Sequence, residues 1–215
     1  MLDRLLSLPV PNLQILIVDD SSPDGTGIIV NEYSRQHPQV HLLSRPGKSG
    51  LGRAYVAGFL HALDKGADAI VQMDADFSHD PSDIPRLLQG LSHSDLIIGS
   101  RYSHGISVIN WPLKRLLISI GGNIYASLIT GLPLKDATGG FKAWRASTLK
   151  DIEVSTVEAD GYGFQVVMNY RAWKKGKTIK EVPIIFTERR DGQSKMSRQI
   201  IWEALWLVWK LRLFG

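Results

Sequence analysis

The residues of this chain that are best suited to chemistry are two aspartates separated by one residue, in Asp74-Ala75-Asp76. They follow residues 69–73, a short apolar stretch that predicts a buried strand. Side chains two residues apart in extended backbone point the same way. Two carboxylates so placed offer the hard oxygen ligands that suit Mg²⁺ or Mn²⁺, which take further ligands from substrate phosphates. A solvated turn with helix-capping aspartates is the alternative that the spacing leaves open.

Asp19 and Asp20 stand in a similar position, after the apolar run at residues 15–18. This run predicts another buried strand, so both carboxylates fall at a strand end, where open α/β sheets bind ligands. Ser22 or Asp24 could instead cap the helix that is predicted to follow. The residues alone leave ligand binding and capping both open.

A glycine-rich segment, residues 46–52, comes after the next predicted strand. Its three glycines, Gly47, Gly50 and Gly52, could simply form a turn. They could equally let backbone N–H groups approach a diphosphate, with Lys48 adding positive charge. The segment is therefore a second candidate for a phosphate contact.

Several basic side chains between residues 101 and 195 are further candidates for phosphate contacts. Each is by itself typical of a solvated surface, and only a fold that gathers them would make a site. The chain has no cysteine, which excludes thiol catalysis and cysteine-bound zinc or iron–sulfur centres, and its six histidines lack metal-ligand spacing. The basic candidates are Arg101, Arg115, Arg189, Arg190 and Lys195.

The elements that must position these residues alternate between short apolar runs and helical patterns. This alternation predicts a single α/β domain with a mostly parallel sheet flanked by helices. Residues 178–186 predict a strand at an edge of the sheet, because they include Pro183. Predicted strands cover residues 15–18, 40–43, 69–73, 96–98 and 178–186, and predicted helices cover 26–33, 53–65, 113–129 and 164–175.

The composition is that of one soluble domain with its own core: 215 residues, 44% hydrophobic and 21% charged. The net charge of +4 is too small to indicate nucleic-acid binding by itself. No uninterrupted apolar run of about 18 residues occurs, so no transmembrane helix is predicted.

The last segment, residues 198–215, predicts an amphipathic helix. Its apolar face is rich in tryptophan and lies near Lys210 and Arg212, a combination typical of a helix at a membrane interface. A helix packed on the domain and a truncated approach to a transmembrane segment are the alternatives. The face consists of Trp202, Leu205, Trp206, Trp209 and Leu213.

Seven segments in order resemble the dolichol-phosphate, or polyprenol-phosphate, mannose synthases within the family 2 glycosyltransferases. The resemblance covers nearly the whole chain. Each motif is weak alone, but seven in register are specific. They are residues 16–26, 45–52 and 73–81, then Gly99-Ser100-Arg101-Tyr102, Thr138-Gly139-Gly140-Phe141, residues 161–165 and Gly192-Gln193-Ser194-Lys195.

The resemblance implies a GT-A (nucleotide-diphospho-sugar transferase) fold and transfer of mannose from GDP-mannose to a polyprenyl phosphate, with inversion. It implies Mg²⁺ or Mn²⁺ held by Asp74 and Asp76, with Ser78 at the position where some relatives supply a third ligand. Donor contacts would come from the metal motif and the two earlier segments. The implied donor-binding residues are Asp19, Asp20, Gly47, Lys48, Asp74, Ala75 and Asp76.

The resemblance also gives the basic residues a role, which is to gather the phosphates of acceptor and donor. Arg101 joins Asp74 and Asp76 as a predicted catalytic residue. A phosphate monoester is already anionic near neutral pH, so no general base is expected, and Asp160 is the residue that tests this. The implied acceptor-phosphate residues are Arg101, Arg115, Arg189 and Lys195.

The expected organisation is a GT-A domain over residues 1–197 followed by the amphipathic helix at 198–215, peripheral at the cytoplasmic face of a membrane. Family members normally begin with a strand that ends in a Pro-Thr-Tyr-Asn-Glu-like motif. Residues 1–6 match the helix after that strand, so the domain is expected to be N-terminally incomplete. A UDP-glucose-type donor with the same lipid phosphate and a truncated, inactive binding relative are the alternatives.

Overall fold

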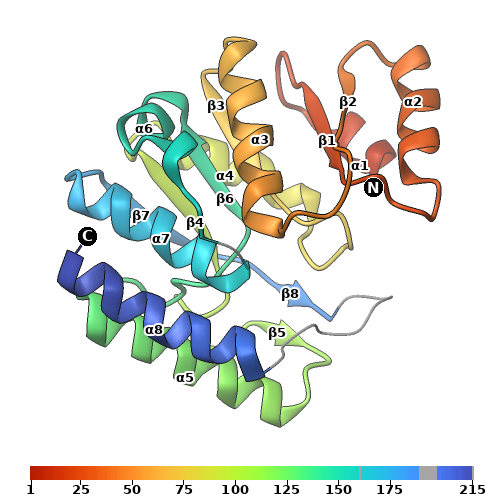
Figure 1. Ribbon diagram of the computed structural model, residues 1–215. Helices are drawn as coiled ribbons and strands as arrows, with labels where there is room; N and C mark the ends of the chain where they lie inside the picture. Colours follow the sequence, from red (N-terminus) through yellow and green to blue (C-terminus); the bar gives the residue numbers. More distant parts are fainter. Residues whose placement is uncertain (160, 189–197, 215) are drawn as a thin grey trace.

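A four-stranded sheet lies at the centre of the computed structural model (Figure 1). Strand β6 (Lys142–Arg145) is antiparallel to both neighbours, β3 (Ala69–Gln72) and β4 (Leu96–Ser100), while β7 (Ile179–Pro183) pairs in parallel with β4. Three strands therefore point the same way, and β6 is the exception to the mostly parallel sheet that was predicted. The structure describes residues 1–159, 161–188 and 198–214, without the side chains of residues 162, 198–204 and 214.

The first two strands form a separate parallel pair, β1 (Ile15–Asp19) with β2 (Val40–Ser44), connected by α2 (Thr26–Gln36). In the described part of the chain this pair shares no strand pairing with the central sheet. Helix α3 (Leu51–Asp64) packs against both β1 and β3 and so bridges the two sheets. The strands that end in the two aspartate motifs, β1 and β3, therefore belong to different sheets.

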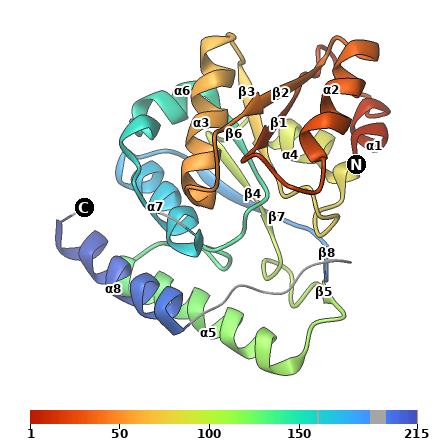
Figure 2. The ribbon, with the colours of Figure 1, turned by 45° about the vertical axis from the view of Figure 1, so that its right-hand side comes forward.

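Three long helices lie together on one side of the central sheet. Helix α8 (Arg198–Phe214) packs against both α5 (Leu113–Thr130) and α7 (Gly161–Lys174), as Figures 1 and 2 show. A Cβ at Gly163 would lie 2.4 Å from Leu207 Cδ2, so any larger residue there would have to displace the Leu207 side chain where α7 packs on α8. The shorter elements are α1 (Leu2–Leu6), η1 (Pro81–Asp83), α4 (Ile84–Gly90), β5 (Val108–Ile109), α6 (Ala146–Asp151), η2 (Val154–Thr156) and β8 (Phe186–Thr187).

The core is divided by the central sheet into two clusters of buried side chains. Alternate residues of β6 point to opposite faces: Trp144 belongs to the cluster shared with α7, and Ala143 to the cluster shared with α4. Lys142, the strand partner of Gln72, is fully buried. A charged residue type thus occupies an interior position in the middle of the sheet.

Most predicted elements are present with boundaries shifted by a few residues. The strand predicted over residues 178–186 is divided into β7 and β8, and Pro183 ends β7 at the predicted sheet edge. Helix α5 runs unbroken through Gly121 and Gly122. In the described part of the chain, no helix combines the length and apolar character needed to cross a membrane.

Candidate active site

The turn after β3 holds Asp74 in a defined orientation. The Tyr55 hydroxyl, from α3, donates to Asp74 Oδ1 at 2.7 Å, and the Asp74 backbone N–H donates to His79 Nδ1 at 3.2 Å. Loss of hydration and the nearby Asp74 carboxylate raise the pKa of Tyr55 well above its usual 10, so the phenol remains a donor. Burial lowers the pKa of His79, which favours the neutral ring that can accept from Asp74.

Asp76 is held by the residues that follow it. Its Oδ1 accepts the Ser78 backbone N–H at 3.0 Å and the Ser78 hydroxyl at 2.5 Å, an Asx-type turn. Phe77, between them, has φ +62°, a left-handed conformation that is uncommon outside glycine. Ser78 is buried and supports Asp76, while its direct contact with a metal stays a prediction.

The two carboxylates fit a divalent cation that is completed by substrate oxygens. In the described part of the chain, the hydrogen bonds of Asp74 leave Oδ2 without a donor, and this oxygen faces Gly140, where a Cβ would lie 3.9 Å away. The described residues contain no cluster of three or more His, Cys, Asp or Glu side chains that could enclose an ion. Mg²⁺ and Mn²⁺ do not need one, because one or two carboxylates plus phosphates and waters suffice.

The two aspartates at the end of β1, Asp19 and Asp20, already have partners. Both oxygens of Asp19, which is buried, lie 3.3 Å from the Ser22 backbone nitrogen, so Asp19 organises the turn before α2. Asp20 Oδ1 forms an ion pair with Arg45 Nη1 at 2.9 Å, without the angles of a hydrogen bond. Of the two predicted capping residues, Asp24 does accept the backbone N–H of Thr26, the first residue of α2, at 3.0 Å. Contact of Asp19 or Asp20 with a nucleoside stays a prediction.

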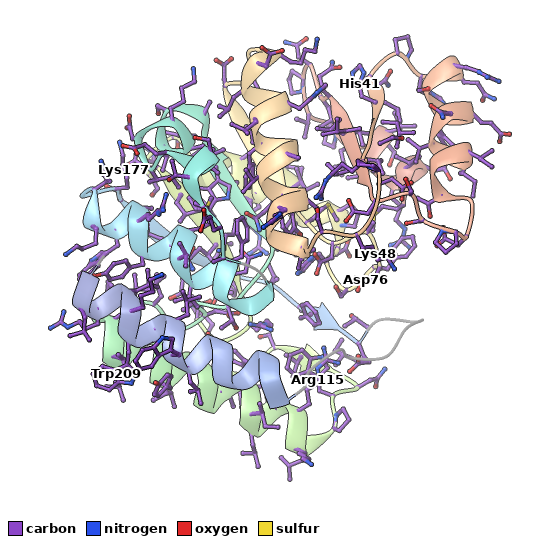
Figure 3. The ribbon with its side chains drawn as sticks, in the orientation of Figure 1. His41, Lys48, Asp76, Arg115, Lys177 and Trp209 are labelled. Carbon is purple, nitrogen blue, oxygen red and sulfur yellow. The ribbon has the colours of Figure 1, made fainter. Side chains whose placement is uncertain are left out.

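The glycine-rich segment lies between β2 and α3. Gly47 borders open space, and Lys48 is exposed. The pKa of Asp24 is lowered mainly by its hydrogen bonds to Thr26, and the positive charge of Lys48 adds a small contribution. Gly50 has φ +104°, a conformation that favours glycine. Figure 3 labels Lys48 and Asp76 on the side of the molecule where α3 begins. Donor contacts from Gly47 and Lys48 stay predictions.

Arg101 is not the solvated cation that its type suggested. It is 6% exposed and forms a bidentate pair with fully buried Asp136, Nε to Oδ2 at 2.7 Å and Nη2 to Oδ1 at 2.5 Å. Nη2 also donates to the Thr138 hydroxyl at 2.9 Å. The pair is formally neutral, so its first effect is to fix the segment after β4, and a catalytic role for Arg101 stays a prediction.

Arg115 is brought to the same place through Trp111. Its guanidinium lies 4.1 Å from the Trp111 ring centroid, and that of Arg101 lies 5.6 Å from the same ring. Arg115 also pairs with Glu188. The fold thus gathers two of the predicted basic residues around one indole (Figure 3 labels Arg115). The other three, Arg189, Arg190 and Lys195, lie outside the described residues, as does Asp160.

Sequence reasoning missed the residues that hold the candidates in place. Tyr55, His79 and Asp136 act through contacts formed only in the fold, although Tyr55 lies on the helix predicted directly after the glycine-rich segment. Trp111 gave no signal of its own. The sequence also contained no indication that one face of α5 is exposed, where Leu117 is 60% and Leu128 is 76% exposed.

Together, an α/β fold and a braced Asp-x-Asp pair at the end of a strand define a nucleotide-sugar-type transferase domain. The family model for Glycosyl transferase family 2 matches residues 1–153, and the chain belongs to this family of glycosyltransferases. It is 48% identical over 196 residues to an undecaprenyl-phosphate mannosyltransferase of Micrococcus luteus, covering 91% of this chain and 81% of that protein. It is 45% identical to a polyprenol monophosphomannose synthase of Mycolicibacterium smegmatis, covering 94% and 78%.

Solved structures show the same fold at low sequence identity. Glucosyl-3-phosphoglycerate synthase from Mycobacterium tuberculosis, with phosphoglyceric acid, aligns with a TM-score of 0.61 at 18% identity, covering 91% of this chain and 69% of that one. The same enzyme with Mn²⁺, UDP-glucose and phosphoglyceric acid aligns with a TM-score of 0.59 at 19% identity, covering 90% and 68%. The predicted GT-A fold and family resemblance are confirmed.

Proposed function

We propose that this protein transfers mannose from GDP-mannose to the phosphate of a polyprenyl phosphate, with inversion at the sugar. The observation that carries the proposal is the braced pair Asp74 and Asp76 at the end of β3, in a chain nearly half identical to two enzymes named for mannosyl transfer to polyprenyl phosphates. The bond from the anomeric carbon to GDP breaks, and a bond to an acceptor phosphate oxygen forms on the opposite face.

Asp74 and Asp76 would hold Mg²⁺ or Mn²⁺, which when bound offsets the charge developing on the departing GDP. Tyr55 and Ser78, which donate hydrogen bonds to Asp74 and Asp76, would hold the two carboxylates in place for the ion. The acceptor phosphate monoester has a second pKa of about 6 and needs no base to deprotonate it. Asp160 is accordingly not assigned a catalytic role.

Arg115 is the better placed of the two gathered arginines to receive the acceptor phosphate. Its side chain is 19% exposed against 8% for Arg101, and its partner Glu188 is 28% exposed against 0% for Asp136. Exchange of a partly exposed carboxylate for a phosphate costs less than breaking the buried pair. Arg101 would then position the segment, and Arg115 would bind the ligand.

Helix α8 would bring the domain to the membrane surface where such an acceptor resides. Trp206, Trp209 and Leu213 are 73%, 44% and 65% exposed, while Val208 is buried against the domain. Leu205, predicted on the same apolar face, is only partly exposed, and the Trp202 side chain lies outside the described residues. An outward tryptophan face beside basic residues suits the headgroup region.

The test is a panel of radiolabelled donors with undecaprenyl phosphate and Mn²⁺. Mannosyl transfer from GDP-mannose is expected, and Asp74→Asn should remove nearly all of it together with metal-dependent GDP binding. Asp64→Asn, at an exposed position at the end of α3, is the matched control and should leave both intact. Glucose transfer without mannose transfer, or GDP binding that stays equally metal-dependent in Asp74→Asn, would contradict the proposal.

A further inference from the structure

A groove of about 500 Å³ runs beside α5, away from the predicted metal site. One wall is the outward side of α5, with Ile120, Ile124 and Leu128, and the opposite side includes Ile106 and Leu134. Ile106, Ile124 and Leu128 are 58%, 55% and 76% exposed, an unusual concentration of large apolar side chains at the surface. Among the described lining residues, Lys135 alone is charged.

One end of this groove is connected to Arg101 through Asn123, Thr138 and Tyr102. Asn123, which lines the groove and is buried, accepts the Thr138 backbone N–H at 3.1 Å, and the Thr138 hydroxyl accepts from Arg101 at 2.9 Å. Tyr102, also in the lining, lies beneath the Arg101 guanidinium at 5.3 Å. The polar end of the groove therefore adjoins Arg101, whose guanidinium shares the Trp111 ring with Arg115, the residue proposed to bind the acceptor phosphate.

The groove then follows α5 away from that end. Ile120 and Leu128 are eight residues apart on the helix, which corresponds to about 12 Å at 1.5 Å per residue. Its outer rim merges with the exposed apolar face of α5, and α5 packs on α8, the helix proposed to contact the membrane. The Tyr125 hydroxyl, which donates to the Leu205 carbonyl at 3.2 Å, joins the two helices.

We propose that this groove binds the first isoprene units of the acceptor. The inference rests on the proposed function and adds the residues that read the lipid. A polyprenyl phosphate has an anionic head and an apolar chain. The groove offers an almost uncharged apolar lining, and Arg101 and Arg115, which share the Trp111 ring, lie beyond its polar end. A site of this kind, mostly apolar with a few polar groups at one end, is how proteins bind such ligands.

The test compares acceptors that share a phosphate but differ in chain. Ile124→Trp fills the groove, and we expect it to raise the KM for farnesyl phosphate about tenfold, the loss expected when a couple of methylene groups are no longer buried. The KM for GDP-mannose and the activity on isopentenyl phosphate, which has almost no chain, should change by less than about twofold. Ile106→Trp, on the opposite wall, should act in the same way.

The matched control is Ile29→Trp, in α2, because Ile29 is 53% exposed against 55% for Ile124 and lines neither the groove nor the metal turn. Ile29→Trp should change neither the KM for farnesyl phosphate nor the KM for GDP-mannose. Thermal unfolding of each variant verifies that it is folded. If Ile124→Trp and Ile106→Trp keep the wild-type preference for the longer chain, or change only the oligomeric state, the groove does not bind the chain. A wild-type protein that transfers mannose to no polyprenyl phosphate would instead refute the proposed function itself.

Discussion

Removal of the Tyr55 hydroxyl tests whether the metal turn depends on a contact from α3. In Tyr55→Phe the ring can keep its stack on Phe164, whose centroid lies 5.8 Å away at an interplanar angle of 5°, so the packing is preserved. What is lost is the 2.7 Å hydrogen bond to Asp74 Oδ1. A hydrogen bond to a charged group contributes about 1.5–3 kcal/mol, and 1.4 kcal/mol is tenfold in an equilibrium constant.

We therefore expect the Kd for Mn²⁺, measured by calorimetry in the presence of GDP, to rise about tenfold to hundredfold in Tyr55→Phe. Saturating Mn²⁺ should restore most of the turnover, because the phenol acts through Asp74 and is assigned no contact with substrate. Tyr33→Phe is the matched control, since the Tyr33 hydroxyl donates to Asp3 Oδ1 at 2.8 Å, the same kind of bond outside the site. Equal Mn²⁺ affinity in the two variants would refute the view that Tyr55 positions Asp74.

Three further predictions follow from other parts of the structure. Replacing Trp206 and Trp209 together by Ala should reduce sedimentation with anionic vesicles and spare GDP binding. Unchanged sedimentation would show that these tryptophans do not bind the membrane surface. Asp136→Asn should lower the free energy of unfolding by about 3–5 kcal/mol in urea titrations, because it leaves the Arg101 charge buried without its partner; a change below about 1 kcal/mol would contradict this. Burial lowers the pKa of Lys142 well below 10.5, so between its folded and unfolded pKa values the unfolded chain binds the extra proton and wild-type stability rises with pH. Lys142→Met should therefore be more stable than wild type at pH 7, by a margin that shrinks toward pH 10, and a margin independent of pH would show that Lys142 does not titrate on unfolding.

The sequence was sufficient for the elements whose local pattern agrees with their final environment. The apolar runs before Asp19 and Asp74 form strands that are buried or partly buried except at Ala69, and both aspartates do lie at strand ends. Strand β6 was missed because Lys142 and Arg145 give it charged ends, and only the tertiary fold shows that Lys142 is interior.

The sequence indicated the candidate site residues, but it did not indicate which side chains they contact. Asp136 lies 35 residues from Arg101, and nothing local in the sequence pairs them. The outward face of α5 was missed for a related reason, since apolar residues at helical spacing predict a buried face as readily as an exposed one. Leu117 and Leu128 became informative only when their exposure was known.

The division of the strands into two sheets has a consequence for how a ligand acts on the protein. The β1–β2 pair has no strand pairing with the central sheet in the described part of the chain, and only side-chain packing joins them: α3 contacts both β1 and β3, and Ile15 and Val40 share a buried cluster with Ala143. A nucleotide that reached the turn after β1 while its diphosphate met the turn after β3 would fasten the two sheets to each other. Hydrogen exchange of the β1–β2 amides would then slow by the factor 1 + [L]/Kd, and the donor would serve as a structural clamp before it served as a substrate.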